Sequence, residues 1–167
     1  MRAWVLTISD SSFAGQRGDI SGPAVQTRLT ELGWSVQLGI LPDDEDLIAE
    51  RLAELADSAS VDAIFTTGGT GVALRDVTPE ATRRVLDREL PGFGEVMRME
   101  GRKATQFAVL SRALAGTRGR TCIVNLPGSP KGAVESLNTI VDLVPHVVDL
   151  LNGYTEHKGL PKLPGER

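Results

Sequence analysis

Cysteine and histidine are scarce in this chain of 167 residues, which contains one cysteine, Cys122, and two histidines, His146 and His157. A single cysteine excludes an internal disulfide, and the lack of a Cys-x-x-Cys pair excludes a cysteine-based zinc site. The histidines are far apart and have no acidic or cysteine partner at a metal-binding spacing, so we interpret them as structural or exposed. Cys122 stands inside an apolar run and is expected in the core.

Aromatic residues, long apolar runs and excess positive charge are also missing. Aromatics make up 4% of the chain, so the core must consist of aliphatic side chains. No apolar run approaches the roughly 20 residues that span a bilayer, and Met1 leads straight into a strand-like run instead of a signal peptide. We therefore expect a cytoplasmic protein with no membrane partner. The net charge of −4 argues against general nucleic-acid binding and leaves any anionic ligand to local groups.

Short apolar runs alternate with amphipathic helical patterns along the chain. The runs predict strands, and the spacing of apolar residues between them predicts helices. Expected strands are 4–8, 36–41, 63–66 and 121–125. Expected helices begin at Pro23 after a cap at Ser21 or Gly22, near Leu47, after Thr78-Pro79, and near Val134, the last continuing to Leu151 with a kink at Pro145. This order predicts a three-layer α/β/α fold with a mainly parallel sheet, as one domain over 1–152 followed by a polar tail rich in Gly and Pro over 153–167.

Polar or glycine-rich loops follow each of the four expected strands. They are 9–22, 42–46, 67–78 and 126–132. Because ligands of open α/β sheets bind beyond the carboxyl ends of the strands, these loops should converge on one cleft.

The glycine loop Gly68-Gly69-Thr70-Gly71 is the most unusual of the four. It is neither a P-loop nor a GxGxxG fingerprint, because no Gly-Lys-Ser/Thr follows it and Leu74 stands where the last glycine would be. Glycines still let consecutive backbone N–H groups approach a phosphate closely. A tight strand-to-helix turn is the alternative, but one glycine would suffice for that.

Asp76 and Asp43 follow strands at the same edge. Asp76 is either a turn or cap residue before the helix at Thr78, or a ligand of a divalent cation that bridges phosphates. Arg75 could pair with phosphate or stand solvated beside an aspartate. Asp43 belongs to an acidic run that suits the positive end of a helix, and only its place at a strand end singles it out.

The run Leu126–Gly132 places Ser129 and Lys131 at a helix start. A hydroxyl and a lysine there fit an anion site, but they equally fit a loop with a capping serine. Ser111 and Arg112 occur in an otherwise apolar stretch, expected to be helical, and could reach the same cleft.

Taken together, these motifs make the chain similar to the molybdopterin adenylyltransferase family, from about Trp4 to Leu151. The motifs that carry the resemblance are TISDSS (7–12), GDISGP (18–23), LPDD (41–44), TTGGTG (66–71), RDVTPEA (75–81), LPGFGE (90–95), LSR (110–112) and NLPGSPKG (125–132). Each is weak alone, whereas their common order and spacing is specific.

The resemblance implies an enzyme that joins molybdopterin to ATP with Mg²⁺, giving adenylated molybdopterin and pyrophosphate, and commonly a homotrimer. It also makes the downstream molybdenum-inserting protein a possible partner. Asp43 and Asp76 match the two essential aspartates of the family and are the expected catalytic and metal-binding residues. The expected substrate-binding residues are Ser9, Asp10, Asp19, Ser21, Gly68, Gly69, Thr70, Gly71, Ser111, Arg112, Pro127, Gly128, Ser129 and Lys131. A non-catalytic molybdopterin carrier and a scaffold with a vestigial site remain the alternative functions.

Overall fold

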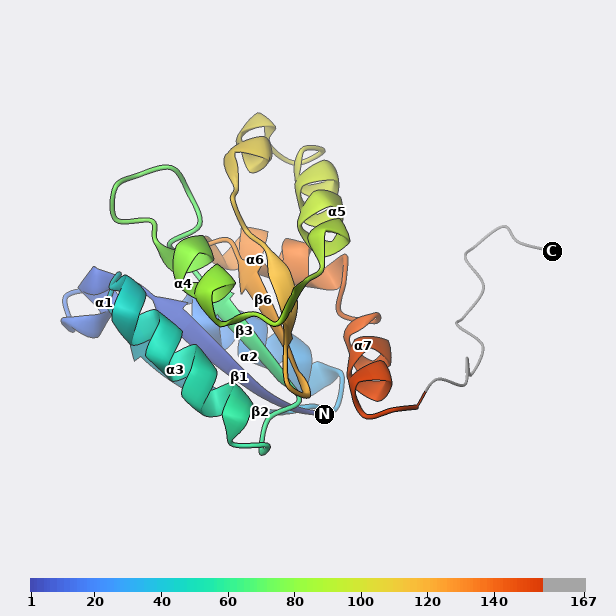
Figure 1. Cartoon of the computed structure of the whole chain (residues 1–167). Coiled ribbons are helices and arrows are strands. Elements are labelled where there is room, and N and C mark those ends of the chain that lie inside the picture. The colour runs from blue at the N-terminus through green and yellow to red at the C-terminus, as the bar shows by residue number, and fades with distance from the viewer. Residues whose placement is uncertain (155–167) are drawn as a thin grey trace.

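The computed structural model describes residues 1–154, and the predicted tail from 155 onward, with His157, lies outside the described residues. A sheet of six strands runs through the molecule in the order β2-β1-β3-β6-β5-β4 (Figure 1). The strands are β1 (Arg2–Ile8), β2 (Ser35–Leu41), β3 (Ala63–Thr67), β4 (Arg88–Glu89), β5 (Ala115–Arg118) and β6 (Thr121–Leu126). The pairs β2-β1, β1-β3 and β3-β6 are parallel, which confirms the predicted mainly parallel sheet.

Helices cover both faces of this sheet, as the three-layer prediction requires. They are α1 (Asp10–Phe13), α2 (Ser21–Glu31), α3 (Glu45–Asp57), α4 (Thr78–Val85), α5 (Pro91–Gly101), the 3₁₀ helix η1 (Gln106–Leu110), α6 (Pro130–Asn138) and α7 (Val144–Leu151). Successive side chains of a strand point to opposite faces. In β3, Phe65 packs into the core with Leu29 and Leu137, while Ile64 packs into the other core with Leu52. The central strands β3 and β6 are buried on both faces, which explains why they appear in the sequence as short apolar runs, 63–65 and 122–124.

Two predicted features of the second half were wrong. The apolar pattern from Val134 to Leu151 is not one kinked helix but α6 and α7, separated by 139–143. Pro145 lies in the first turn of α7, where its missing N–H leaves no hydrogen bond unmade. Ser111 and Arg112 are not helical, because η1 ends at Leu110 and the chain continues in an extended conformation.

The antiparallel strands β4 and β5 were not predicted. They pair with each other, and β5 pairs with β6 through a hairpin at Gly119. Neither strand has an apolar run, since β4 has two residues and β5 has the sequence AGTR. Their contribution is backbone pairing at the edge of the sheet, which leaves little trace in hydrophobic periodicity.

The cap of α2 also differs from the prediction. Asp19, and not Ser21 or Gly22, satisfies the free N–H groups of the first turn. Its carboxylate accepts hydrogen bonds from the backbone N of both Ser21 and Gly22, each at 3.1 Å. A carboxylate at this position also suits the positive end of the helix.

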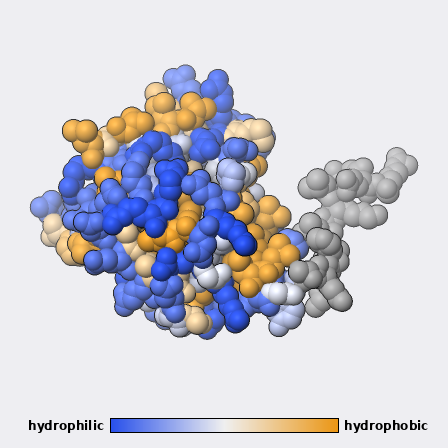
Figure 2. All heavy atoms as spheres, viewed as in Figure 1, coloured by the Kyte–Doolittle hydropathy of each residue, from blue (hydrophilic) through white to orange (hydrophobic). Residues whose placement is uncertain are grey.

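The surface carries apolar residues in two places. Figure 2 shows one apolar region over α7 and another over η1 and the loop after β3. Exposed apolar residues of the first region are Leu143 and Leu150, and those of the second are Val72, Leu74, Phe107, Val109 and Leu110. Within residues 1–154, no helix combines the length and apolarity that crossing a membrane requires.

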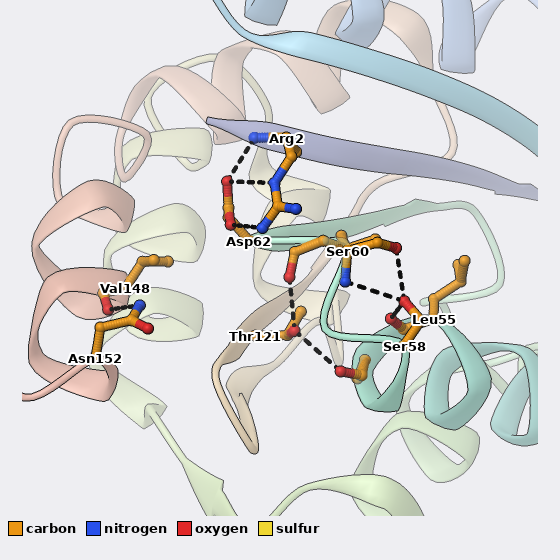
Figure 3. A network of polar contacts seen from close by, with 10 residues as sticks. Arg2, Leu55, Ser58, Ser60, Asp62, Thr121, Val148 and Asn152 are labelled. Carbon is orange, nitrogen blue, oxygen red and sulfur yellow. Dashed lines mark hydrogen bonds and ion pairs between the residues drawn. The ribbon is translucent and has the colours of Figure 1, made fainter.

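Polar contacts at the amino ends of the strands connect neighbouring strands and the loops that precede them (Figure 3). Arg2 forms an ion pair with Asp62 at 2.7 Å, so the starts of β1 and β3 are held together. The Thr121 hydroxyl donates to the carbonyl of Val61 at 2.9 Å. These contacts join the starts of β1 and β6 to the segment 61–62 that precedes β3.

Candidate functional site

The carboxyl ends of the four parallel strands meet at one edge, as predicted from the polar loops. Hydrogen bonds join neighbouring strand ends, from Ser9 N to the carbonyl of Leu41 at 2.9 Å and from Gly68 N to the carbonyl of Leu126 at 3.2 Å. A Cβ on Gly128 would lie 3.2 Å from the Cα of Gly68. The loops after β3 and β6 therefore touch through their backbones.

The glycine loop needs its glycines for more than one reason. Gly68 and Gly69 have positive φ angles of 98° and 62°, a region that residues with a Cβ avoid. Gly68 also lies against the carbonyl of Ile8, and a side chain there would collide with that backbone. Thr78 donates its hydroxyl to the Gly68 carbonyl at 2.9 Å and its N–H to the Gly69 carbonyl at 3.1 Å. The loop is thus a fixed backbone structure seated on the start of α4.

Asp43 and Asp76 approach this loop from two sides. The Asp43 Oδ1 atom lies 3.3 Å from where a Cβ of Gly69 would be, and the Asp76 Oδ2 atom lies 2.7 Å from the equivalent position on Gly71. Asp44 caps α3 by accepting from the backbone N of Asp46 and Leu47, so Asp43 is left to point toward the glycine loop. The two candidate acids therefore flank one stretch of backbone.

Asp76 is a turn residue and does not cap α4. Its Oδ2 accepts from Ala73 N at 2.8 Å, and the residue at the helix N-cap, Val77, has no side-chain cap. The turn interpretation is confirmed and the capping interpretation is wrong. A carboxylate oxygen that accepts one backbone N–H keeps further lone pairs available for a cation.

Negative charge accumulates beside the glycine loop. Partial burial raises the pKa of Asp43, and the charges of Asp10 and Asp76 raise it further, against the opposing hydrogen bond from Asp10 N. That bond is reciprocated, since Asp10 N donates to Asp43 Oδ2 and Asp43 N donates to Asp10 Oδ1, both at 2.9 Å. Arg75 forms an ion pair with Asp10 at 2.7 Å and lowers the pKa of that carboxyl. Arg75 is therefore paired with an aspartate in this structure.

Two cavities lie on either side of the glycine loop. The first, about 540 Å³, has a mostly apolar lining from the glycine loop, α5, η1 and the start of α6. The second, about 400 Å³, is more polar and is enclosed by the loop after β1, the start of α2 and the end of β3. Gly128 and Ser129 line both cavities, so one short segment separates them.

Most of the predicted site residues line one of these cavities. Those in the first are Gly69, Thr70, Gly71, Asp76, Ser111 and Pro127; those in the second are Ser9, Asp19, Ser21 and Gly68; Gly128 and Ser129 belong to both. Asp10 and Asp43 lie next to the loop but outside both linings. The Ser129 hydroxyl accepts from Gly132 N at 3.2 Å, so the capping interpretation of that serine is confirmed.

Lys131 and Arg112 contact protein groups. Lys131 is exposed and lies 3.8 Å from Glu135 on its own helix. Arg112 is half-buried and donates to two backbone carbonyls and to Glu80. Sequence inspection could place both near the cleft but could not give the direction of either side chain.

Several lining residues were not singled out from the sequence. Arg98 of α5 donates to the carbonyl of Ala113 at 2.9 Å and so holds one wall of the first cavity. In the second cavity, the Thr7 hydroxyl donates to Asp19 at 2.7 Å, and the hydroxyls of Ser21 and Thr67 are 2.9 Å apart. The signal that could have identified Thr7 and Thr67 is a hydroxyl at the end of an otherwise apolar strand. Arg98 gives no such signal.

No cluster of three or more His, Cys, Asp or Glu side chains suitable for a metal ion occurs within residues 1–154. Cys122 is buried in β6, as predicted, and burial raises the pKa of its thiol to about 12. A dedicated protein-only metal centre is thus absent from the part of the chain that the structure describes.

The fold and the site define a class: an open α/β protein with a cleft at the carboxyl ends of its parallel strands, where proteins of this architecture bind their ligands. Comparison with known proteins narrows the class. Residues 4–146 match the family described as "probable molybdopterin binding domain", and the chain belongs to that family.

The most similar relatives agree with this assignment. The molybdopterin adenylyltransferase of Helicobacter pylori is 44% identical over 152 residues, covering 89% of this chain and 86% of the relative. That of Escherichia coli K12 is 38% identical, covering 92% and 86%. Among solved structures, the molybdopterin biosynthesis enzyme MoaB of Thermus thermophilus is 47% identical, with a TM-score of 0.85 over 91% of this chain and 96% of that one.

Proposed function

We propose that this protein is a molybdopterin adenylyltransferase of molybdenum cofactor biosynthesis. The observation that carries the proposal is the divided cleft: two cavities meet at Gly128 and Ser129, beside a glycine loop flanked by Asp43 and Asp76. A reaction that joins two large substrates needs two adjoining sites and a shared place for the reacting phosphates. The names of the relatives supply the substrates, molybdopterin and an adenylyl donor, for which we propose ATP.

In the proposed reaction, an oxygen of the molybdopterin phosphate attacks the α-phosphorus of ATP. The new O–P bond forms as the bond between the α-phosphorus and the bridging oxygen breaks, and that oxygen leaves with pyrophosphate. Such a transfer requires little covalent chemistry from the protein, so catalysis consists of positioning and of neutralising phosphate charge. The glycine loop provides backbone N–H groups at close range for this purpose.

Mg²⁺ is the proposed cofactor, and Asp43 and Asp76 would hold it. Mg²⁺ sites of this kind use one or two carboxylates together with substrate phosphates, so a cluster of three protein ligands is not required. The residues fit the ion because both provide carboxylate oxygens, which Mg²⁺ prefers, and both reach the glycine loop: Asp43 Oδ1 lies 3.3 Å from the Cβ position of Gly69 and Asp76 Oδ2 lies 2.7 Å from that of Gly71. When bound, Mg²⁺ would screen the phosphate charge that the aspartates otherwise repel.

The test measures pyrophosphate release and molybdopterin binding in wild type and Asp76→Asn. Turnover should fall at least about a hundredfold, comparable to the loss of one preorganised electrostatic contact. Molybdopterin affinity should change less than about threefold, since the proposed cradle is backbone. Asp87→Asn is a matched control, because Asp87 also accepts from a backbone N–H, that of Gly119 at 2.7 Å, but lies away from the cleft.

Other outcomes distinguish the alternative functions. If the wild type binds molybdopterin but releases no pyrophosphate with ATP and Mg²⁺, the protein is a carrier and the enzyme proposal is wrong. If it binds neither ligand, the scaffold hypothesis replaces both.

We further propose that the protein works as a cytoplasmic homotrimer and passes its product to a molybdenum-inserting protein. The exposed apolar residues of α7 and η1 support self-association, since monomeric proteins rarely expose large apolar patches. Light scattering at micromolar concentration tests the trimer, and a monomeric mass would contradict it.

A further inference from the structure

Arg112 holds both ends of the loop that carries Asp76. Its backbone N–H donates to the Thr70 carbonyl at 2.9 Å. Its guanidinium donates through Nε to the Gly71 carbonyl at 2.6 Å and through Nη2 to the Asp76 carbonyl at 2.5 Å. The remaining nitrogen, Nη1, donates to the carboxylate of Glu80. One residue thus fixes three carbonyls of the segment 70–76 and ties them to α4.

The charge of Arg112 is already compensated within the protein. Burial opposes ionisation of Glu80, but the hydrogen bond and positive charge of Arg112 prevail and lower the pKa of Glu80. All three guanidinium nitrogens have acceptors, two of them neutral carbonyls. Three of its five N–H donors, one on each nitrogen, are engaged within the protein, so the guanidinium cannot offer a phosphate a pair of free parallel donors without breaking one of these bonds.

The two carbonyl contacts also set the direction of the neighbouring peptide groups. In a trans peptide, the C=O and the following N–H point in opposite directions. With the Gly71 carbonyl turned to Arg112, the N–H of Val72 faces away from it, and the same holds for Asp76 and Val77. Arg112 therefore determines how the backbone beside Asp76 is presented to the cleft.

We infer that Arg112 is a positioning residue of the adenylyl-transfer site, which orients the loop 70–76 and the Asp76 carboxylate without contacting a substrate. This inference rests on the proposed function. It replaces the expectation from the sequence that Arg112 binds substrate. Glu80 is part of the same device, because it anchors the guanidinium to α4.

Arg112→Lys is the informative substitution. Lysine keeps the positive charge but is a single point donor without the planar fork, so it cannot serve both carbonyls and Glu80 together. The kcat should fall at least about tenfold, as expected for a small misplacement at a reacting centre. The Mg²⁺ concentration needed for half-maximal activity should rise, while the KM for molybdopterin should stay within about twofold.

Arg118→Lys is the matched control. Arg118 also donates to a carboxylate, that of Asp57, and to a backbone carbonyl, that of Val85 at 3.0 Å. Neither Arg118 nor these partners line a cavity of the cleft. Its replacement should affect stability like that of Arg112 and leave kcat and the Mg²⁺ dependence unchanged.

Hydrogen exchange provides a readout that does not depend on turnover. In Arg112→Lys, the hydrogen-bonded amides of the loop, those of Ala73 and Asp76, should exchange at least about tenfold faster, while those of β3 stay protected. If Arg112→Lys does not fold, Glu80→Gln serves the same purpose. Glutamine has the shape of glutamate but no charge, so it weakens the contact that holds the Arg112 guanidinium to α4.

The outcomes separate this inference from the proposed function. Unchanged exchange of the Ala73 and Asp76 amides, or equal kinetic effects of the Arg112 and Arg118 variants, overturns the positioning role. A wild type that releases no pyrophosphate overturns the proposed function and with it the catalytic role of Arg112. Faster exchange with lower kcat and raised Mg²⁺ requirement supports the inference.

Discussion

Gly69→Ala should destabilise the protein through two separate effects at one position. The left-handed φ of 62° becomes strained once a Cβ is present. The new Cβ would also collide with the Thr78 hydroxyl. The Thr78 side chain must then rotate away. This rotation breaks its 2.9 Å hydrogen bond to the carbonyl of Gly68, so that buried carbonyl loses a hydrogen-bond donor.

The expected magnitude follows from these two effects. A residue with a Cβ in the left-handed region costs about 1–2 kcal/mol. Loss of a partner by a buried polar group costs about 1–3 kcal/mol. The free energy of unfolding should therefore fall by about 2–5 kcal/mol, and at about 2–4 °C per kcal/mol for a domain of this size the Tm should fall by at least about 4 °C.

A double-mutant cycle with Thr78→Ala separates the two effects. Thr78→Ala alone breaks the same hydrogen bond but also removes the hydroxyl that the Cβ would strike. The double variant should be less destabilised than the sum of the single variants by about 1–3 kcal/mol, because one hydrogen bond is lost once and the collision is gone. Denaturant unfolding at equilibrium gives the three free energies.

Gly15→Ala controls for backbone strain alone. Gly15 has a similar φ of 68°, and a Cβ there would meet nothing within 4 Å. The free energy of unfolding of Gly15→Ala should therefore fall only by the cost of the left-handed conformation, about 1–2 kcal/mol. Additive effects of Gly69→Ala and Thr78→Ala, or a Gly69→Ala effect no larger than that of Gly15→Ala, would refute the collision argument.

Two further predictions concern how stability depends on pH. The pKa of Asp43 is raised in the folded protein, so its contribution is complete below the ordinary aspartate pKa and is lost as pH rises through the folded value. Asp43→Asn should therefore gain in Tm relative to wild type between about pH 4 and neutrality. The pKa of Glu80 is lowered, so its contribution is present above the ordinary value and is lost as pH falls through the folded value. Glu80→Gln should lower the Tm most at neutral pH and least in acid. For either variant, a Tm difference from wild type that does not change with pH would contradict the prediction.

The sequence allowed the parallel half of the sheet and the position of the cleft to be predicted. Strands buried on both faces are mainly apolar, as the run 63–65 is, and parallel strands must present their carboxyl ends at one edge. In the acidic run 43–46, the helix-start role accounted for residues 44–46 and only its place at a strand end distinguished Asp43; the structure shows that Asp44 caps α3.

Other features depend on contacts that sequence spacing does not encode. The hydrogen bonds between Asp10 and Asp43 join residues 33 positions apart, and Arg112 meets Gly71 across 41 positions. Nothing near Arg112 in the chain indicates that its partners are carbonyls. The break between α6 and α7 does not interrupt the apolar pattern, because Ile140 and Val141 of the connecting segment are also core residues.

The segment that separates the cavities has a consequence for the rate of turnover. Gly128 and Ser129 form a wall between two compartments, so a molecule made by joining the occupants of both is held at two places at once. Such a bivalent ligand dissociates only when both halves are released at the same time. After one half is released, the half that is still bound keeps the free half close to its cavity, so the free half rebinds rapidly. Under the proposed function, the joined product would bind more tightly than either substrate. Its departure, and not the bond-forming step, would then limit turnover.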